Sequence, residues 1–416
     1  MRFFHISDLH FGKQLYGYDL TEEHRNFIRQ LGKYCEEYSP DAVLIAGDIY
    51  DRAVPSAGAV TLMDELLMTL SGITVLIISG NHDNVQRLNY GSDFLRKHNI
   101  YISSMPPVED LKMEKISLSD ENGNVNFYLL PFFRPVMFKN SMPDEYLNGE
   151  NAIIKKIVQN ADIDKSERNV VMSHQFFISG HEEPKLCDSE QLPAIVGGLD
   201  AVDIAAFEDF EYSALGHIHG GQFVGNEKNR YSGTPVKFSV SERNHNKSIV
   251  MVDLEEKGKK AEITKLPLNQ IRDVKKLEGY FEDIIALADE EIKKDYVSIT
   301  LRDEDIIPNV KEKLNAYFDN ILEVIIDNSQ TRKIMLDDVE ELKENIDFNG
   351  SMEYNVPYKY MKIGDSSQSN KFYWLNNKWY EYSTTGKLQE VTIKQYKDLL
   401  GNTTEDDSAN KYKNES

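Results

Sequence analysis

The sequence predicts an α/β fold built on a parallel sheet with helices on its faces. Strand-like apolar runs at residues 3–6, 41–46 and 73–78 alternate with helical stripes at 21–38 and from about residue 56. This alternation of strands and helices is typical of parallel sheets. Each apolar run also ends abruptly in polar residues. Because ligands of such folds gather beyond the carboxyl ends of the strands, we expect the functional site at that edge.

The spacing of apolar residues supports each element in turn. Phe27, Leu31 and Cys35 recur every four residues, as on one face of a helix. Five of the six residues from Ile73 to Ile78 are apolar, which is typical of a strand covered on both faces. Gly80 then permits a sharp turn of the backbone.

Polar side chains follow the first three predicted strands. Asp8 and His10 are two residues apart, so an extended backbone places both on one face. Asp48 follows the second strand, and Asn81 and His82 follow the third. Five of the ten histidines lie at predicted strand ends, namely His10, His82, His174, His217 and His219. Any one of them alone fits a structural role, but the whole set indicates a shared site.

The assembled set is typical of a metal centre. Seven side chains are candidate ligands, with His82 left over: Asp8, His10, Asp48, Asn81, His174, His217 and His219. Imidazoles, carboxylates and one amide without a thiolate suit Mn²⁺, Fe²⁺ or Zn²⁺. Seven ligands are too many for one tetrahedral ion. They suit two ions roughly 3.5–4 Å apart that share a carboxylate and promote in-line attack on phosphorus.

Composition sets further bounds on the function. The chain has 416 residues, a formal charge of −22 and two cysteines, Cys35 and Cys187. We therefore expect neither a disulfide framework nor a thiolate metal site. No apolar stretch approaches the ~20 residues of a membrane helix, and we expect a cytoplasmic protein without a membrane partner. Nucleic-acid binding normally needs a basic face, so bound cations would have to attract an anionic substrate.

The later chain changes character twice. Residues 231–254 have a hairpin-like pattern that we expect to close a second sheet. Residues 271–346 resemble a small α+β unit with 20 acidic and 11 basic side chains. Residues 347–401 are rich in aromatic residues, with a predicted hairpin around Asn376-Asn377 and a helix from Thr392 to Leu400. We expect residues 402–416 to be a disordered tail.

The motifs resemble those of the calcineurin-like metallophosphoesterases in order and approximate spacing. They are Asp8-Leu-His10, Gly47-Asp48, Gly80-Asn-His82, His174 and Gly216-His-Ile-His219. The resemblance implies a four-layer αββα sandwich over residues 1–260 with two metal ions. One ion would be held by Asp8, His10, Asp48 and His219, and the other by Asp48, Asn81, His174 and His217. His82 would be the catalytic imidazole, with Asp83 to orient it.

A narrower resemblance, over about residues 1–345, is to the SbcD-type nucleases. It rests on Gly47-Asp-Ile-Tyr-Asp-Arg52, Ser173-His-Gln-Phe-Phe, Asp188-Ser-Glu with Val196-Gly-Gly-Leu-Asp200, and Tyr231-Ser-Gly-Thr-Pro-Val-Lys-Phe-Ser239. It implies a Mn²⁺-dependent 3′–5′ double-strand exonuclease and single-strand endonuclease acting on DNA ends and hairpins. Residues 271–346 would cap the DNA. The implied partners are DNA, an SbcC-like SMC-type ATPase and a second nuclease subunit in a heterotetramer, associated with the bacterial nucleoid.

Other functions remain open on the residues alone. Arg52 and Arg87 each follow a motif closely and are candidates for contacts with substrate phosphate, or are solvated surface arginines. The same seven ligands would also suit a metallophosphoesterase for small phosphodiesters or nucleotides. A third hypothesis is a scaffold whose metal site is structural and whose tail recruits partners.

Overall fold

The structure is a computed structural model that describes two compact units. It describes residues 1–143, 146–147, 149–190, 201–329 and 331, and the backbone of four strands between residues 359 and 391. The first unit is Met1–Leu336 and the second is Asp337–Ser416. The predicted boundary between residues 346 and 347 lies outside the described residues.

The first unit contains a six-stranded sheet in the order β16-β15-β1-β4-β5-β6. Its parallel strands are β1 (Arg2–Ile6), β4 (Ala42–Ala46), β5 (Thr74–Ile78) and β6 (Ile100–Ser103). They are connected through α1 (Thr21–Tyr38), α2 (Ala57–Thr69), α3 (Val85–Leu88) and α4 (Ser92–Arg96). The Ser56 side chain caps α2 by accepting a hydrogen bond from Ala59 N. The predicted strand-helix alternation is confirmed.

A second six-stranded sheet has the order β13-β14-β12-β9-β8-β7. Its strands are β7 (Glu114–Asp120), β8 (Gly123–Leu130), β9 (Arg168–His174), β12 (Tyr212–Gly216), β13 (Gln222–Val224) and β14 (Asn226–Tyr231). Strand β12 runs parallel to both β9 and β14. The ends of β9 and β12 therefore point to the same edge.

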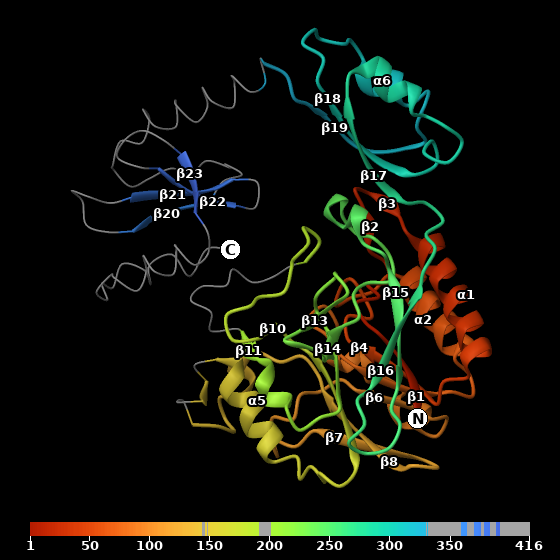
Figure 1. Ribbon diagram of the computed structural model, residues 1–416, viewed down its shortest axis with the longest axis vertical. Helices are drawn as coiled ribbons and strands as arrows, with labels where there is room; N and C mark the ends of the chain where they lie inside the picture. The colour runs from red at the N-terminus through yellow and green to blue at the C-terminus, as the bar shows by residue number, and fades with distance from the viewer. Residues whose placement is uncertain are drawn as a thin grey trace. The chain divides into compact units, whose positions relative to one another are not determined.

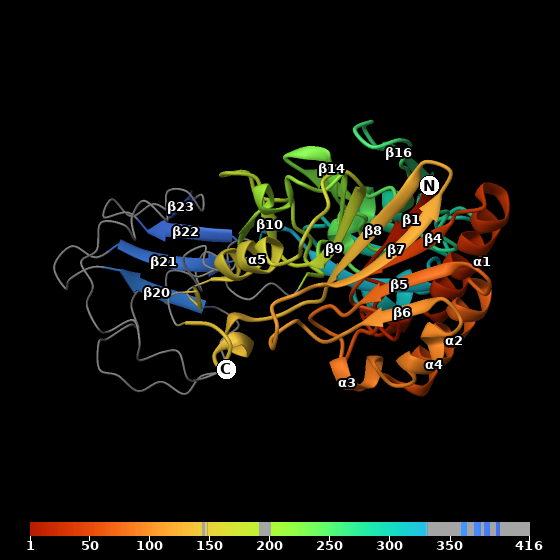
Figure 2. The ribbon, with the colours of Figure 1, turned by 90° about the horizontal axis from the view of Figure 1, so that it is seen from below.

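The two sheets pack face to face between helical layers. Their inner faces share an apolar cluster that includes Leu44 and Ile78 of one sheet and Phe127 and Met172 of the other. Helices α1 and α2 pack on the outer face of the first sheet (Figure 1). Figure 2 shows α1 and α2 from below, beside β4, β5 and β6. The outer face of the second sheet is covered by α5 (Glu150–Gln159) and η3 (Ile204–Phe207), which gives four layers.

One expectation for this region was wrong. The predicted hairpin beyond residue 231 does not close the second sheet, because β15 (Ser248–Asp253) pairs antiparallel with β1 and with β16 (Glu262–Pro267) of the first sheet. Arg2 and Asp253 are register partners, and Arg2 Nε donates to Asp253 Oδ1 at 2.8 Å. The shorter elements of this region are β2 (Gln14–Leu15), β3 (Tyr18–Asp19), β10 (Phe177–Ile178), β11 (Val202–Asp203), η1 (Pro135–Phe138) and η4 (Val240–Asn244), of which β2-β3 and β10-β11 form separate two-stranded sheets.

A small three-stranded parallel sheet follows in the same unit, and we refer to residues 271–326 as the cap. Its strands are β17 (Val274–Gly279), β18 (Tyr296–Leu301) and β19 (Asn320–Ile326), with α6 (Phe281–Ala286) and α7 (Val310–Leu314). The alternation in β18 predicts one buried face, yet all six residues are buried, including Ser298 and Thr300. The reason is that both faces are covered, one by α6 and α7 and the other, at Tyr296, by the cluster that contains Leu20 and Phe238.

The cap is attached to the two-sheet layers through α1. Glu23 of α1 is buried, and its Oε1 accepts hydrogen bonds from Tyr296 Oη at 3.0 Å and Arg272 Nε at 2.5 Å. The Arg272 guanidinium also lies 5.2 Å from the centre of the Tyr296 ring. Leu20 and Phe238 join Tyr296 in one apolar cluster. This contact combines apolar burial with a charge-assisted hydrogen-bond pair.

The second unit contains four antiparallel strands: β20 (Lys359–Ile363), β21 (Asn370–Leu375), β22 (Lys378–Tyr382) and β23 (Leu388–Val391). The predicted hairpin strands are confirmed, with Trp374 and Trp379 as register partners. The Asn376-Asn377 turn, the helix expected at 392–400 and the tail lie outside the described residues. Among the described helices, none combines the length and apolar character required to cross a membrane.

The Glu23 contact predicts a measurable effect of Tyr296→Phe. Removing the hydroxyl deletes one hydrogen bond to a buried carboxylate, so we expect the free energy of unfolding to fall by about 1–3 kcal/mol. Urea denaturation measures the change. Tyr280→Phe is the matched control, because the Tyr280 side chain is 58% exposed. Equal stability of the two variants would contradict the role given to Glu23.

Candidate metal centre

All seven predicted ligands lie where the two sheets meet at their carboxyl ends. Asp8 and His10 follow β1, Asp48 follows β4, and Asn81 follows β5. His174 is the last residue of β9, and His217 and His219 follow β12. The first sheet thus supplies the oxygen ligands and one imidazole, and the second sheet supplies three imidazoles. Six of the seven are buried, and Asn81 is half-buried.

The ligand atoms converge on two points. At the first, His10 Nε2 is 3.2 Å from His219 Nε2 and 3.6 Å from Asp48 Oδ2. At the second, Asn81 Oδ1 is 3.1 Å from His174 Nε2 and 2.9 Å from His217 Nδ1. Asp48 Oδ2 is also 3.4 Å from His174 Nε2, so this carboxylate reaches both points.

Asp8 lies close to both points as well. One of its oxygens is within 4.8 Å of ligand atoms of His10 and His219, and within the same distance of atoms of Asp48 and His174. Both Asp8 oxygens accept from His217 N at 3.1 Å, and Ser7 Oγ donates to Oδ2. The carboxylate of Asp8 therefore connects the two sheets directly.

The backbone is strained at four of these ligands. Asp8, His10, Asp48 and His217 have φ angles of 53°, 44°, 51° and 102°, a region that residues other than glycine seldom adopt. Such conformations cost roughly 1–3 kcal/mol each and concentrate at functional sites. Backbone bonds hold two of them, from Asp8 N to Gly47 O and from His10 N to Asp48 O, both at 3.0 Å. The sequence pattern gives no sign of this strain.

Three glycines allow the close approach of the strand ends. A Cβ on Gly216 would lie 1.9 Å from Ala46 O, and one on Gly80 would lie 2.1 Å from Asp48 Oδ1. A Cβ on Gly47 would lie 2.3 Å from His174 Nδ1. Gly47 also has a φ of +89°. The space beside Gly80 is occupied by the Asp48 carboxylate, and the space beside Gly47 by the His174 ring. The space beside Gly216 is occupied by Ala46 O, which accepts a hydrogen bond from His174.

Burial perturbs the ionisation of the whole set. It raises the pKa of Asp8 to about 7. Burial lowers the pKa of His217 and the pKa of His219 to about 3 each. For His174, burial acts to lower the pKa, but the Asp48 and Asp8 carboxylates and the hydrogen bond to Ala46 O together outweigh it and raise the pKa to about 9. The cluster thus combines carboxylates and imidazoles whose pKa values burial and neighbouring charges shift in both directions.

This donor set fits divalent cations. The Nε2 atoms of His10 and His219 face each other at 3.2 Å, and an amide oxygen and a carboxylate oxygen face His174 Nε2. Acceptors that converge in a buried space are costly unless they are paired or bind a metal. The outer nitrogen of His174 donates to Ala46 O at 2.8 Å, which leaves its Nε2 free to act as a ligand. Oxygen and imidazole donors without sulfur favour ions such as Mn²⁺, Fe²⁺ or Zn²⁺.

His82 lies beside this set and is only partly buried. Its Nδ1 donates to Asp51 O at 2.8 Å, so its Nε2 carries the free lone pair or a transferable proton. Its ring centre is 4.8 Å from that of His10. The backbone N–H of His82 donates to Asp48 Oδ1 at 2.9 Å. His82 thus holds the Asp48 carboxylate through its backbone N–H and places its own imidazole beside the candidate ligands.

Asp83 does not orient His82 as expected. Its carboxylate accepts from three backbone N–H groups, those of Gly80 at 2.9 Å and of Ile49 and Tyr50 at 3.1 Å. It therefore connects the turn after β5 to the turn after β4. Burial raises the pKa of Asp83 to about 6. Asp51, whose carbonyl holds His82, performs the role that the sequence suggested for Asp83.

The two arginine candidates lie on the surface. The Arg52 side chain is 81% exposed, and its Nε is 3.7 Å from Asp51 Oδ2. Arg87 is exposed in α3, and its backbone N–H donates to Asn84 Oδ1. The sequence interpretation did not single out Lys13, whose side chain is 13% exposed and whose Nζ is 3.0 Å from Asp51 Oδ1. Its position three residues after His10 was the available signal.

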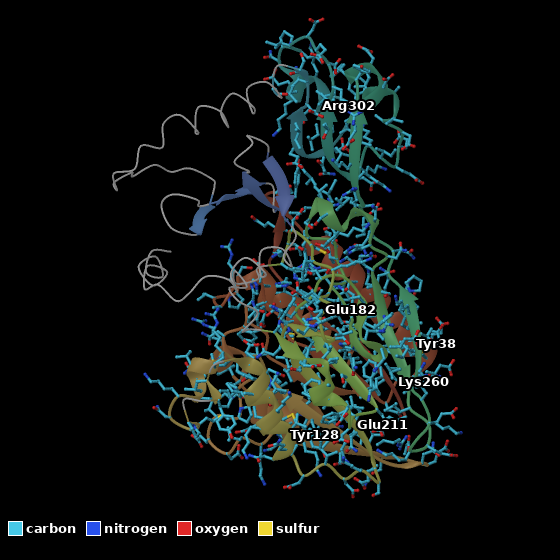
Figure 3. All side chains as sticks on the ribbon, turned by 60° about the vertical axis from the view of Figure 1, so that its left-hand side comes forward. Tyr38, Tyr128, Glu182, Glu211, Lys260 and Arg302 are labelled. Carbon is cyan, nitrogen blue, oxygen red and sulfur yellow. The ribbon has the colours of Figure 1, made fainter. Side chains whose placement is uncertain are left out.

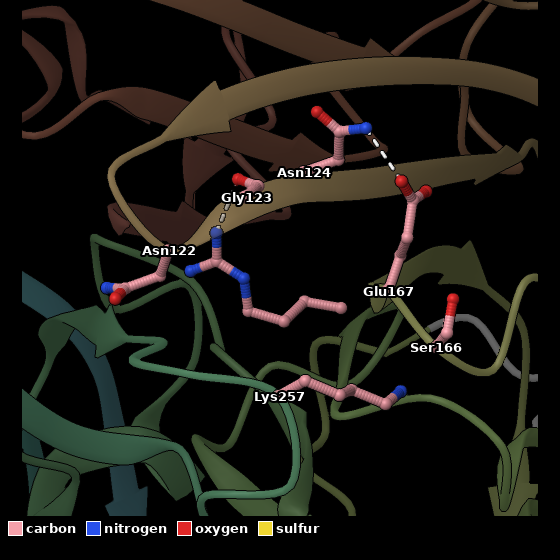
Figure 4. A pocket seen from close by; sticks show the side chains of 7 residues that line it. Asn122, Gly123, Asn124, Ser166, Glu167 and Lys257 are labelled. Atoms are coloured by element: carbon pink, nitrogen blue, oxygen red, sulfur yellow. Dashed lines mark hydrogen bonds between the residues drawn. The ribbon is translucent and has the colours of Figure 1, made fainter.

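A cavity of about 220 Å³ lies elsewhere, beside the turn between β7 and β8 (Figure 4). Its polar groups largely bond to one another: Asn124 Nδ2 donates to Glu167 Oε1 at 2.7 Å, and Arg168 donates to Gly123 O at 2.7 Å. Because these groups are already paired, the cavity does not resemble a prepared binding site. It is distinct from the metal ligands.

Comparisons with known proteins agree with this geometry. The family model described as calcineurin-like phosphoesterase matches residues 1–221. A second model, SbcD_C, described as the type 5 capsule protein repressor C-terminal domain, matches residues 270–348. The chain therefore belongs to the calcineurin-like phosphoesterase family.

A curated relative narrows the assignment. The chain is 31% identical over 342 residues to the SbcD component of the SbcCD nuclease of Staphylococcus epidermidis, a match that covers 79% of this chain and 87% of the relative. Within its family, the chain is thus of the SbcD type. A solved structure titled "GAP50 the anchor in the inner membrane complex of Plasmodium" matches with 10% identity and a TM-score of 0.37, covering 65% of this chain and 89% of that one. That score is too low to support an argument.

The glycine contacts predict the effect of Gly216→Ala. The new Cβ would overlap Ala46 O and disturb its hydrogen bond with His174, so we expect a loss of about 1–3 kcal/mol in stability and weaker metal binding. Thermal unfolding with and without Mn²⁺ measures both effects. Gly58→Ala in α2 is the control, because the atom nearest to its new Cβ would be Ser56 Oγ at 3.9 Å. A Gly216→Ala protein with wild-type stability and metal binding would show that the strand ends are not packed this closely.

Proposed function

We propose that this chain is a two-metal DNA nuclease subunit that hydrolyses phosphodiester bonds at DNA ends and hairpins. The observation that carries the proposal is the convergence of seven candidate ligands at two points joined by Asp48. His82 lies beside them, and its ring donates to Asp51 O rather than to any of the seven ligands. A structural metal site would not need a free imidazole there. The similarity to a nuclease component over 79% of the chain supports DNA as the substrate.

The ligand geometry supports a division into two ion sites. Asp8, His10, Asp48 and His219 would hold one ion, and Asp48, Asn81, His174 and His217 would hold the other. Bound divalent ions, with Mn²⁺ as the proposed species, would supply positive charge and an activated water for in-line attack on phosphorus. Asp48 would be the shared ligand, fixed by the backbone N–H of His82.

His82 would act as the general acid. Its Nδ1 is held by Asp51 O, so a proton on Nε2 can pass to the leaving oxygen of the substrate. Asp83 would position this turn through its three backbone contacts rather than touch the substrate. Arg52, next to Asp51, and Arg87 on α3 would contact substrate phosphate.

We further propose the finer activities that the resemblance to SbcD-type nucleases implies. These are 3′–5′ double-strand exonuclease and single-strand endonuclease activity, in partnership with an SbcC-like SMC-type ATPase in DNA repair. Two nuclease subunits would join in a heterotetramer at the bacterial nucleoid. The cap would lie over the DNA.

A second candidate is the hydrolysis of small phosphodiesters. The observation that favours it is the charge of the cap, because residues 271–326 carry 14 acidic and 8 basic side chains. Four of these eight basic side chains also pair with carboxylates, namely Arg272, Lys275, Lys276 and Arg302. Arg302, labelled in Figure 3, donates to Glu278 Oε2 at 3.2 Å. A cap of this kind offers little attraction for DNA phosphates.

Replacing the imidazole tests the nuclease. We expect His82→Ala to lose about 10²–10⁴-fold in the rate of DNA cleavage, because the proton donor is gone. Mn²⁺ binding should persist, since the bond from His82 N to Asp48 is made by the backbone. The substrates are a labelled DNA hairpin, a linear duplex and bis(p-nitrophenyl) phosphate, all with Mn²⁺. His98→Ala is the control, because His98 is exposed.

The outcome separates the two candidates. Turnover of the small diester by the wild type without DNA cleavage, even with an SbcC-like ATPase present, would favour the small-substrate enzyme. Unchanged DNA cleavage by His82→Ala would show that the imidazole takes no part in the reaction.

A further inference from the structure

The imidazole of His219 has an outer partner that the proposed reaction does not use. His219 Nδ1 lies 2.7 Å from Ser189 Oγ, and the same hydroxyl lies 2.6 Å from Glu242 Oε1. Ser189 is half-buried, and Glu242 has an exposure of 0%. A single hydroxyl thus stands between a candidate metal ligand and a fully buried carboxylate.

The surroundings of Glu242 determine which way the Ser189 hydroxyl donates its hydrogen bond. Its Oε2 is 2.5 Å from Lys247 Nζ, an ion pair in which both side chains are buried. Its Oε1 accepts from Phe238 N at 3.0 Å and from Ser239 Oγ at 3.1 Å. A carboxylate surrounded by donors is ionised and can only accept. The proton of Ser189 must therefore point to Glu242.

That direction determines the tautomer of His219. Because Ser189 Oγ uses its proton on Glu242, it offers only lone pairs to His219, so Nδ1 must carry the hydrogen. Nε2 is then bare, and it is the atom that faces His10 Nε2 at 3.2 Å. A carboxylate or hydroxyl on the outer nitrogen of a metal-binding histidine orients the ring and raises its basicity.

The backbone of His219 is held by the same group of residues. His219 N donates to Glu190 Oε1 at 2.6 Å, and His219 O accepts from Lys247 Nζ at 3.1 Å. The side chain and both backbone groups of His219 therefore bond to residues 189–190 and to the Glu242–Lys247 pair. His174 differs, because its outer nitrogen bonds to a backbone carbonyl, that of Ala46.

We propose that Ser189 is a positioning residue, which relays the buried Glu242–Lys247 pair to His219 and presents His219 Nε2 to one of the two metal ions. The proposal rests on the two-metal function above and assigns a role to the Asp188-Ser-Glu motif. Because His174 is oriented by a backbone carbonyl, Ser189 serves only the ion on the His219 side.

The test is the titration of the full-length Ser189→Ala protein with Mn²⁺ by isothermal calorimetry. We expect wild type to bind two ions, and Ser189→Ala to bind one of them 10–100-fold more weakly with the other unchanged. Ser241→Ala is the matched control. It loses a hydroxyl from the same network, but that hydroxyl contacts Ser239 Oγ and Asp188 N rather than His219.

A second pair of variants separates the hydroxyl from packing. Ser189→Thr keeps the hydroxyl and should retain the affinity of both sites, whereas Ser189→Val has the same shape without it and should weaken one site. If Ser189→Ala does not fold, the comparison of Ser189→Thr with Ser189→Val still tests whether the hydroxyl is needed for Mn²⁺ binding. Equal Mn²⁺ affinities in Ser189→Thr and Ser189→Val, or unchanged binding by Ser189→Ala, would overturn the proposal.

The result is distinguishable from failure of the proposed nuclease. A wild-type chain that binds two Mn²⁺ ions but cleaves no DNA would refute the nuclease and leave the role of Ser189 standing. Wild type that binds no Mn²⁺ would refute both.

Discussion

The structure depends on the burial of one carboxylate, Asp48, between imidazoles of two different sheets. Its Oδ2 lies 3.6 Å from His10 Nε2 and 3.4 Å from His174 Nε2. Buried charges are costly unless they are paired or coordinate a metal. The left-handed backbone at Asp48, the missing side chain at Gly80 and the bond from His82 N all serve to hold this carboxylate in place. The packed sheets therefore act as a rigid frame for cations.

Much of this arrangement could be predicted because local sequence encodes it. The helix at Thr21–Tyr38 has the predicted bounds, and the ligand candidates stood out because parallel strands share one carboxyl edge. Sheet membership could not be predicted, since the apolar run of β15 would suit a buried strand in either sheet. The partners of His219 were equally hidden. Ser189 and Glu242 are 53 positions apart, and no periodicity connects them.

The segment from Lys237 to Lys247 connects the metal centre to the cap. Phe238 lies 5.6 Å from the ring centre of His10, and it belongs to the apolar cluster that contains Tyr296 of the cap. Lys237 Nζ donates to Asp273 Oδ1 at 2.6 Å, just before β17. The same segment also carries Glu242 and Lys247, so the residues that orient His219 lie within ten positions of the residues that contact the cap.

The most direct test of the central claim is anomalous scattering from crystals of the protein grown with Mn²⁺. The two-ion arrangement predicts two peaks, separated by about 3.5–4 Å, one on each side of the Asp48 carboxylate. One would lie near His219 and the other near His174. A single peak, or two peaks that do not share Asp48, would contradict the claim that this buried carboxylate is the ligand common to two metal ions.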